Sequence, residues 1–307
     1  MNPDLLPQAL SAYAIKPLRS DLLQSDRQIV FHLVAARGRE YALRIYPPGQ
    51  RDRRTIWSQC QWLRAIARDT DLLVPEPIPN RDGDDVTPLN GGWCTLTRWV
   101  PGRRRFWKNG PGADVLRNVG HLMAQLHEHG QTFKPPPGFR CPRWDWHGLF
   151  GTTSPWYPQR KLALDKPTRQ LFDRIMRRTR AIMQNLGTGQ HVFGLIHGDL
   201  MQANYVVDRG HVHPIDFADF GRGYFLYDMA VTLLMLKPFD QRATQRHAFI
   251  QGYRQVRPVS PEHESLLDDF LAARAVLLAR LALGAAEPRA SDLQWVNQTL
   301  PWLVVGA

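Results

Sequence analysis

The sequence predicts an α+β fold in two lobes: a small antiparallel-sheet lobe with one helix over residues 1–100, and a larger, mostly helical lobe over 101–307. Three observations predict it. Apolar residues form short, strand-like runs through most of the first hundred residues and recur at helical spacing through most of the rest. The change falls at Pro101 and Gly102, residue types that end strands. A chain of 307 residues also has the length of about two domains.

In the first lobe, the runs 29–36 and 41–46 are rich in β-branched and apolar residues and flank a turn that contains Gly38, which predicts a hairpin. Two prolines then end the second strand. A helix is indicated next by apolar residues at spacings of three and four: Ile56, Cys60, Leu63 and Ala67. A further strand is predicted over 93–100.

The second lobe is predicted to contain four helices, because apolar residues at helical spacing begin at four places: Val115, Leu171, Leu226 and Leu266. Gly112 and Asp114 are start signals for the first of them, and Asp114 is predicted as its N-cap. One stretch is strand-like instead. It comprises 192–196, 205–207 and 212–215, with a turn at 208–210, and predicts a short hairpin in this lobe.

Composition excludes several classes of protein. Three cysteines, far apart and without a C-x-x-C pair, indicate neither a disulfide framework nor a zinc knuckle. No secretory signal and no apolar stretch of membrane-spanning length is present, so we expect a cytoplasmic protein without a membrane partner. Thirty-nine Lys and Arg against 28 Asp and Glu give a net charge of +11, which attracts anions. The basic runs lack a nucleic-acid-binding motif, so nucleic acid is not expected as the main partner.

The segment GLIHGDLMQANYVVDRGHVHPIDFADFGRG, residues 194–223, carries the chemistry. It places Asp199, Asn204 and Asp216 at the ends of predicted strands, where the turns of a hairpin bring them together. Carboxylate and amide oxygens are hard ligands suited to Mg²⁺, and one carboxylate can remain free as a base. This spacing is used for phosphoryl transfer by the catalytic loop of kinases and the metal-binding Asp after it.

HGDLMQAN followed by PIDFADFGRG, with YDMA shortly after, resembles the aminoglycoside phosphotransferase and choline kinase superfamily, which shares its fold with protein kinases. YALRIYPP, LTRWVPGR and GHLMAQLHEHG resemble flanking parts of that superfamily, in the same order along the chain. The likeness covers residues from about 29 to 285. It implies a bilobal, protein-kinase-like fold with a nucleotide-binding first lobe and a second lobe for catalysis and the substrate.

The resemblance also implies roles for individual residues. Asp199 would accept the proton of a substrate hydroxyl as this hydroxyl attacks the γ-phosphate of ATP, and Asn204 and Asp216 would hold Mg²⁺. Arg44 occupies the place of a lysine that touches the α and β phosphates. Trp99 lies in the stretch 98–100 that would face adenine.

The sequence departs from the kinase pattern in three places. Residues 18–31 contain no glycine, so a Gly-rich loop over the phosphates is absent. Arg44 stands where kinases have lysine, and a guanidinium is a planar, bidentate donor instead of a compact point charge. Gln59 stands where a glutamate would pair with that cation, and its amide can hydrogen-bond Arg44 without neutralising it.

The predicted function is ATP-dependent transfer of the γ-phosphate to a hydroxyl of a small molecule. A metabolite alcohol is favoured over a polycationic aminoglycoside, which a chain of net charge +11 repels at long range. Two alternatives stay open: a kinase-fold binding module without activity, and a Ser/Thr kinase that acts on a protein. The sequence makes no prediction about oligomeric state or about ATP against GTP.

Single residues around the motif allow more than one interpretation. His197 is predicted to hold the catalytic loop by hydrogen bonds, and Asp228 to bond to the same loop. Asp219 either joins the metal or substrate site or caps a turn. The histidines around the hairpin offer a less favoured transition-metal site. Four tryptophans are candidates for lining a substrate pocket: Trp99, Trp144, Trp146 and Trp156.

Overall fold

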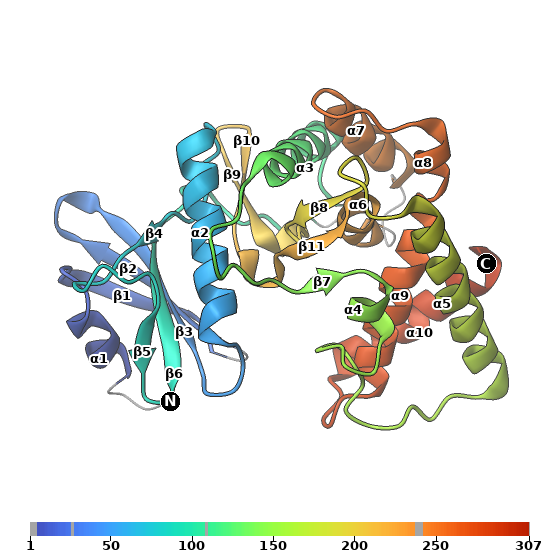
Figure 1. Ribbon diagram of the computed structural model, residues 1–307, viewed down its shortest axis with the longest axis horizontal. Coiled ribbons are helices and arrows are strands. Elements are labelled where there is room, and N and C mark those ends of the chain that lie inside the picture. Colours follow the sequence, from blue (N-terminus) through green and yellow to red (C-terminus); the bar gives the residue numbers. More distant parts are fainter. Residues whose placement is uncertain (1–4, 26–27, 108–109, 237–241, 307) are drawn as a thin grey trace.

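A computed structural model of the chain describes residues 5–25, 28–107, 110–236 and 242–306. It shows a sheet-rich lobe at one end and a helical lobe at the other, which confirms the predicted fold class (Figure 1). The strands are β1 (Pro17–Gln24), β2 (Ile29–Ala35), β3 (Glu40–Tyr46), β4 (Pro77–Ile78), β5 (Thr87–Leu89), β6 (Gly92–Arg98), β7 (Arg143–Trp144), β8 (Phe193–Ile196), β9 (Tyr205–Asp208), β10 (His211–Pro214) and β11 (Gly221–Tyr224). The helices are α1 (Leu5–Ser11), α2 (Arg53–Asp69), α3 (Ala113–Thr132), α4 (Trp146–Phe150), α5 (Lys166–Leu186), α6 (Phe225–Leu234), α7 (Arg242–Arg254), α8 (Pro261–Ser265), α9 (Leu267–Leu283) and α10 (Ala290–Gly306).

The first lobe is an antiparallel sheet of order β1-β2-β3-β6-β4, with β5 also paired to β6. The predicted hairpin is β2–β3. Its inward residues, together with those of β6, form a small core that includes Leu33, Leu43 and Leu96. Strand β1 was not predicted, because it lies at the edge of the sheet, where most of its side chains are exposed and the alternation is weak. The sequence signal is strong only where one face of a strand is buried.

Helix α2 stands between the two lobes (Figure 1). Asp52 caps its N-terminus by accepting a hydrogen bond from the backbone N–H of Thr55 at 2.9 Å. Its apolar face contributes Trp62 and Ile66, both fully buried, to the core of the helical lobe. The indole N–H of Trp62 lies 3.2 Å from Nδ1 of His129 on α3. This helix therefore fixes the position of the sheet relative to the helices.

The helical lobe contains the four predicted helices as α3, α5, α6 and α9, to which α4, α7, α8 and α10 add. Asp114 is not the N-cap of α3, contrary to expectation: Gly112 takes that position, and the exposed carboxylate of Asp114 pairs with Arg117 at 2.7 Å. The strand-like stretch divides between two sheets. Strands β9 and β10 form the predicted hairpin, whereas β8 pairs with β11 and lies with it in a three-stranded sheet that also holds β7.

The boundary between 100 and 101 falls in the connection between β6, which ends at Arg98, and α3, which begins at Ala113. This division into two lobes at residue 100 stays a prediction.

None of the helices in the described part of the chain combines the length and the apolar character that crossing a membrane requires.

Candidate active site

The loop after β8 carries the first pair of predicted site residues. The side-chain amide of Asn204 donates to Oδ2 of Asp199 at 2.8 Å and to the backbone carbonyl of Asp199 at 2.7 Å. A short 3-10 turn over Gln202–Asn204 places the amide there. The spacing of five residues therefore brings the two side chains together, as the sequence predicts.

Gly198 allows this loop to approach the loop that follows β10. Its φ of +81° lies in the region that favours glycine, and a Cβ atom added to it would stand 2.1 Å from the carbonyl oxygen of Asp219. Any larger residue would push the two loops apart. The glycine in HGD is thus required by close packing between the two halves of the site.

Asp228 on α6 holds the loop after β8 by hydrogen bonds, as predicted. Its Oδ1 accepts from the backbone N–H of Gly198 at 2.8 Å, and its Oδ2 accepts from the backbone N–H of His197 at 3.0 Å. His127 on α3 lies 3.0 Å from Oδ2 as well. Burial opposes the charge on Asp228, but these hydrogen bonds and the nearby imidazoles outweigh it and lower the pKa of the carboxyl.

His197 has the structural role that the sequence predicts. Its Nε2 donates to the carbonyl of Ile215 at 3.1 Å, and its Nδ1 accepts from the backbone N–H of Asp199 at 3.3 Å. This pattern requires the neutral ring with the proton on Nε2. Burial lowers the pKa of His197, which favours the same neutral form.

Acid is expected to destabilise the fold through its buried histidines. Burial lowers the pKa of His127, His129 and His197 below the ordinary 6.5. Each binds fewer protons in the folded than in the unfolded state, so stability falls as pH drops from that value towards the folded pKa. The expected slope is up to about 1.4 kcal/mol per pH unit for each histidine. Urea denaturation at pH values on either side of 6.5 measures it, and equal free energies of unfolding on both sides would contradict it.

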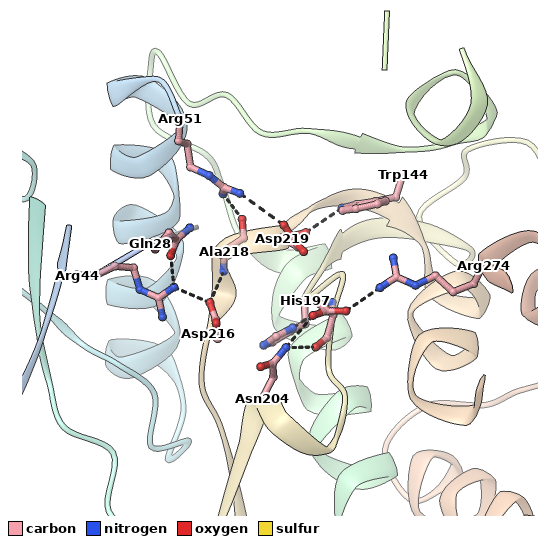
Figure 2. Close-up of polar contacts among 11 residues, drawn as sticks. Gln28, Arg44, Arg51, Trp144, His197, Asn204, Asp216, Ala218, Asp219 and Arg274 are labelled. Carbon is pink, nitrogen blue, oxygen red and sulfur yellow. Dashed lines mark hydrogen bonds and ion pairs between the residues drawn. The ribbon is translucent and has the colours of Figure 1, made fainter. Parts of the chain in front are cut away.

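Asp216 lies two residues after the end of β10 and has a left-handed backbone, φ 57° and ψ 65°. Its Oδ1 accepts from Nη1 of Arg44 on β3 at 2.7 Å and from the backbone N–H of Ala218 at 3.4 Å (Figure 2). Burial alone would raise the pKa of Asp216, but the charge and hydrogen bond of Arg44 lower it. The carboxylate is thus held ionised, the form that binds a metal.

The amide partner of Arg44 is Gln28, and not Gln59 as the sequence suggested. Nη1 of Arg44 donates to Oε1 of Gln28 at 2.5 Å. Gln59 is buried, and with Arg44 it lines a cavity against the sheet; its Oε1 has no hydrogen-bond partner among the described residues. The carboxylate of Asp216 is a stronger acceptor than the amide of Gln59 on α2, so the Arg44 guanidinium bonds to Asp216 instead.

Arg51 immediately precedes Asp52, the N-cap of α2, and belongs to one of the basic runs of the sequence. Its side chain is only 17% exposed, because it crosses to the loop after Asp216. It donates to the carbonyl of Ala218 and lies 3.5 Å from the carboxylate of Asp219 (Figure 2). Trp144 donates its indole N–H to the backbone carbonyl of Asp219 at 2.9 Å. Asp219 therefore belongs to the site, and Asp216 is the residue that caps the turn.

Asp199 is held at its other oxygen by Arg274 on α9, with Nη2 at 2.7 Å from Oδ1. Burial raises the pKa of Asp199 to about 7, with Asp219 and Asp216 adding repulsion and Arg274 opposing both. Three carboxylates thus share one region, and each of them pairs with a different arginine. Their mutual repulsion is what a bound cation would relieve.

A cavity and a larger cleft meet at Asp216, which lines both of them. A cavity of about 130 Å³ lies against the sheet and is lined by Val30, Ala42, Arg44 and Trp99, among others. A larger cleft of about 1500 Å³ faces the helical lobe, and Asp199, Asn204, Asp216 and Asp219 all line it. Trp144 and Trp156 line this cleft, whereas Trp146 instead donates to the carbonyl of Met176 on α5.

In the stretch 98–100, which is expected to face adenine, part of the backbone already forms hydrogen bonds within the sheet lobe. The backbone N–H of Arg98 donates to the backbone carbonyl of Glu76 at 2.8 Å, and that of Trp99 donates to the backbone carbonyl of Glu40 at 3.1 Å. The Trp99 ring lies against His32, with ring centroids 4.1 Å apart. Two of the three N–H groups in 98–100 are therefore occupied, and the role of Trp99 stays a prediction.

The donor set suits a hard cation. Asp216 and Asn204 offer oxygen ligands at the cleft, which matches Mg²⁺ held by one or two protein oxygens and completed by phosphates and water. Among the described residues, no group of three or more His, Cys, Asp or Glu gathers as a metal cage. The transition-metal site considered for the histidines around the hairpin therefore finds no support, although His211 and His213 do stack on one face.

Sequence reasoning missed Gln28, Arg51 and Arg274. Only Arg274 left a local signal, because it is one of two charged residues, with Arg280, in the apolar helical stretch 270–283. Gln28 contacts Arg44 within the sheet lobe, and Arg51 reaches across to the carbonyl of Ala218 in the helical lobe.

The kinase-like fold and this pair of loops define a phosphotransferase site. A family model described as the phosphotransferase enzyme family matches residues 15–268, and the chain belongs to this family. It is therefore an enzyme of the small-molecule kinase class.

Similar proteins agree with this assignment. A homoserine kinase of Cupriavidus pinatubonensis is 28% identical over 78% of this chain and 72% of its own length. An amicoumacin kinase of Bacillus subtilis is 24% identical, with the same two coverages. Among solved structures, a microcompartment-associated aminopropanol kinase aligns with a TM-score of 0.85 and 25% identity, covering 98% of this chain and 95% of its own.

Proposed function

We propose that this enzyme transfers the γ-phosphate of ATP to a hydroxyl group of a small metabolite, with Asp199 as the general base. The hydroxyl loses its proton to the Asp199 carboxylate, the hydroxyl oxygen bonds to the γ-phosphorus, and the bond from that phosphorus to ADP breaks. The observation that carries the proposal is the convergence of Asp199, Asn204 and Asp216 on one cleft beside a cavity that holds Arg44.

The relatives support ATP and a divalent cation. An amicoumacin kinase solved in complex with AMP-PNP, Ca²⁺ and Ami shares the fold, with a TM-score of 0.82 at 18% identity. In this chain, Asn204 and Asp216 would hold Mg²⁺, which supplies charge neutralisation for the phosphates when bound. Arg44 and Arg51 would neutralise phosphate oxygens from the side of the sheet, where the Gly-rich loop of kinases is missing.

The acceptor is proposed to be a metabolite alcohol and not a polycation. Each carboxylate that lines the cleft already has a hydrogen-bond or ion-pair donor: Asp52, Asp145, Asp199, Asp216 and Asp219. Arginines also line the cleft, among them Arg104 and Arg140. Little negative charge is therefore free to attract a polycation, which agrees with the net charge of +11.

Binding and turnover test the proposal together. A ligand that binds only the folded state at 100 times its Kd adds about 2.7 kcal/mol, so ATP with Mg²⁺ should raise the unfolding temperature by a few degrees. Incubation with ³²P-labelled ATP and a panel of small alcohols should then move label into a small molecule. Nucleotide binding without transfer would favour the silent module, and label in protein bands of a cell extract would favour a protein kinase.

A further inference from the structure

Helix α9 buries one charged side chain among apolar ones. Of the residues that it buries, Arg274 alone carries a charge, and its side chain is 10% exposed. A guanidinium is rarely buried unless it is paired, because removal from water is costly. The partners of Arg274 therefore indicate what the charge does.

Two contacts hold the guanidinium. Nη2 donates to Oδ1 of Asp199 at 2.7 Å, and Nη1 donates to the hydroxyl of Tyr227 on α6 at 3.0 Å. The Tyr227 ring is itself fixed, stacked on Trp144 with centroids 5.5 Å apart. Nε of Arg274 is buried and has no hydrogen-bond partner among the described residues. The group is thus arranged around Asp199 and Tyr227 and leaves one donor unsatisfied.

The catalytic loop supplies no cation of its own. Between Asp199 and Asn204 lie Leu200, Met201, Gln202 and Ala203, all uncharged. Arg274, 75 residues further along the chain, supplies the positive charge that contacts the Asp199 carboxylate. With Asn204 donating to Oδ2, both oxygens of the carboxylate are held by the protein. Each oxygen has two lone pairs, so one on each is left for the acceptor hydroxyl.

We propose that Arg274 is a positioning residue for phosphotransfer, which holds the Asp199 carboxylate in the orientation that receives the proton of the acceptor hydroxyl. The inference rests on the proposed role of Asp199. A purely structural role, in which Arg274 only ties α9 to α6 and the loop, predicts a loss of stability with unchanged turnover. A positioning role predicts a loss in kcat, because a base displaced by about 1 Å costs on the order of 100-fold.

The experiment compares five variants of the full chain by steady-state kinetics and thermal unfolding. Arg274→Ala should lower kcat about 100-fold, with KM for ATP and for the acceptor within about twofold. Arg274→Lys keeps the positive charge but loses the guanidinium fork, so its kcat should lie between those of the native chain and Arg274→Ala. Tyr227→Phe removes the second anchor of the guanidinium and should lower kcat several-fold. Millimolar guanidinium chloride should restore part of the kcat of Arg274→Ala and leave the wild type unchanged.

Arg257→Ala is the matched control. Arg257 is also buried, pairs with Glu128 at 2.6 Å and lies over the ring of Phe225, but has no contact with Asp199. It should lose stability and keep kcat within about twofold. Arg274→Ala with a wild-type kcat, or with only KM raised, overturns the inference. If that variant does not fold, an unchanged kcat in both Arg274→Lys and Tyr227→Phe overturns it equally.

Asp199→Asn separates this inference from the function on which it rests. If Asp199→Asn keeps full turnover, Asp199 is not the base, and both the proposed function and the positioning role of Arg274 are rejected. An inactive Asp199→Asn variant beside a fully active Arg274→Ala variant keeps the proposed function and rejects only the positioning role.

Discussion

Replacing Asp199 with Asn is expected to lower kcat by between about 100-fold and about 10,000-fold, the range that a general base contributes. The amide has nearly the same shape, but it cannot accept the proton of the acceptor hydroxyl at neutral pH. Its oxygen can still accept from Arg274, which the carboxylate contacts at 2.7 Å in the native chain. The fold should therefore be retained.

The measurement is a steady-state assay on purified variant and native chain, with the thermal shift by Mg-ATP as a check on folding. Asp269→Asn serves as a matched control, because Asp269 also accepts from an arginine, Arg178, but is not among the residues that line the cleft. That control should keep native kcat. Full activity of Asp199→Asn would falsify the assignment of this residue as the base.

Asp216→Ala is expected to abolish the metal-dependent part of nucleotide binding. The variant loses the carboxylate proposed to hold Mg²⁺, so adding the cation to ATP should no longer increase the thermal shift. Arg44 loses its ion pair at 2.7 Å and becomes free for phosphate, so the shift by ATP alone should persist. The part of the shift that disappears is a few degrees if the native site is saturated.

Asp85→Ala provides the comparison for Asp216→Ala. Asp85 is buried and pairs with Arg64 in the sheet lobe, yet it lines neither the cavity nor the cleft. Its removal should lower the unfolding temperature and leave the metal dependence intact. A Mg²⁺-dependent shift of native size in Asp216→Ala would show that the cation is held elsewhere.

The local sequence predicts those parts of this protein that neighbouring residues decide. The hairpin of β2 and β3, four of the helices and the pairing of Asp199 with Asn204 depend on periodicity or on residues at most a few positions apart. Edge strand β1 was missed because exposure weakens the alternation, and the separation of β8 from β9 and β10 was missed because strand pairing is a long-range choice.

The sequence by itself determined the family resemblance, the candidate base and metal ligands, and the role of Asp228 beneath the loop. The tertiary structure decided which arginines pair with the carboxylates of the site. Arg44 lies 172 residues from Asp216, Arg51 lies 168 from Asp219, and Arg274 lies 75 from Asp199. Periodicity shows which face of a helix is buried, but the partner of a charge depends on how separate elements pack. Gln59 and Gln28 illustrate this, since packing and not motif position selects the amide that bonds Arg44.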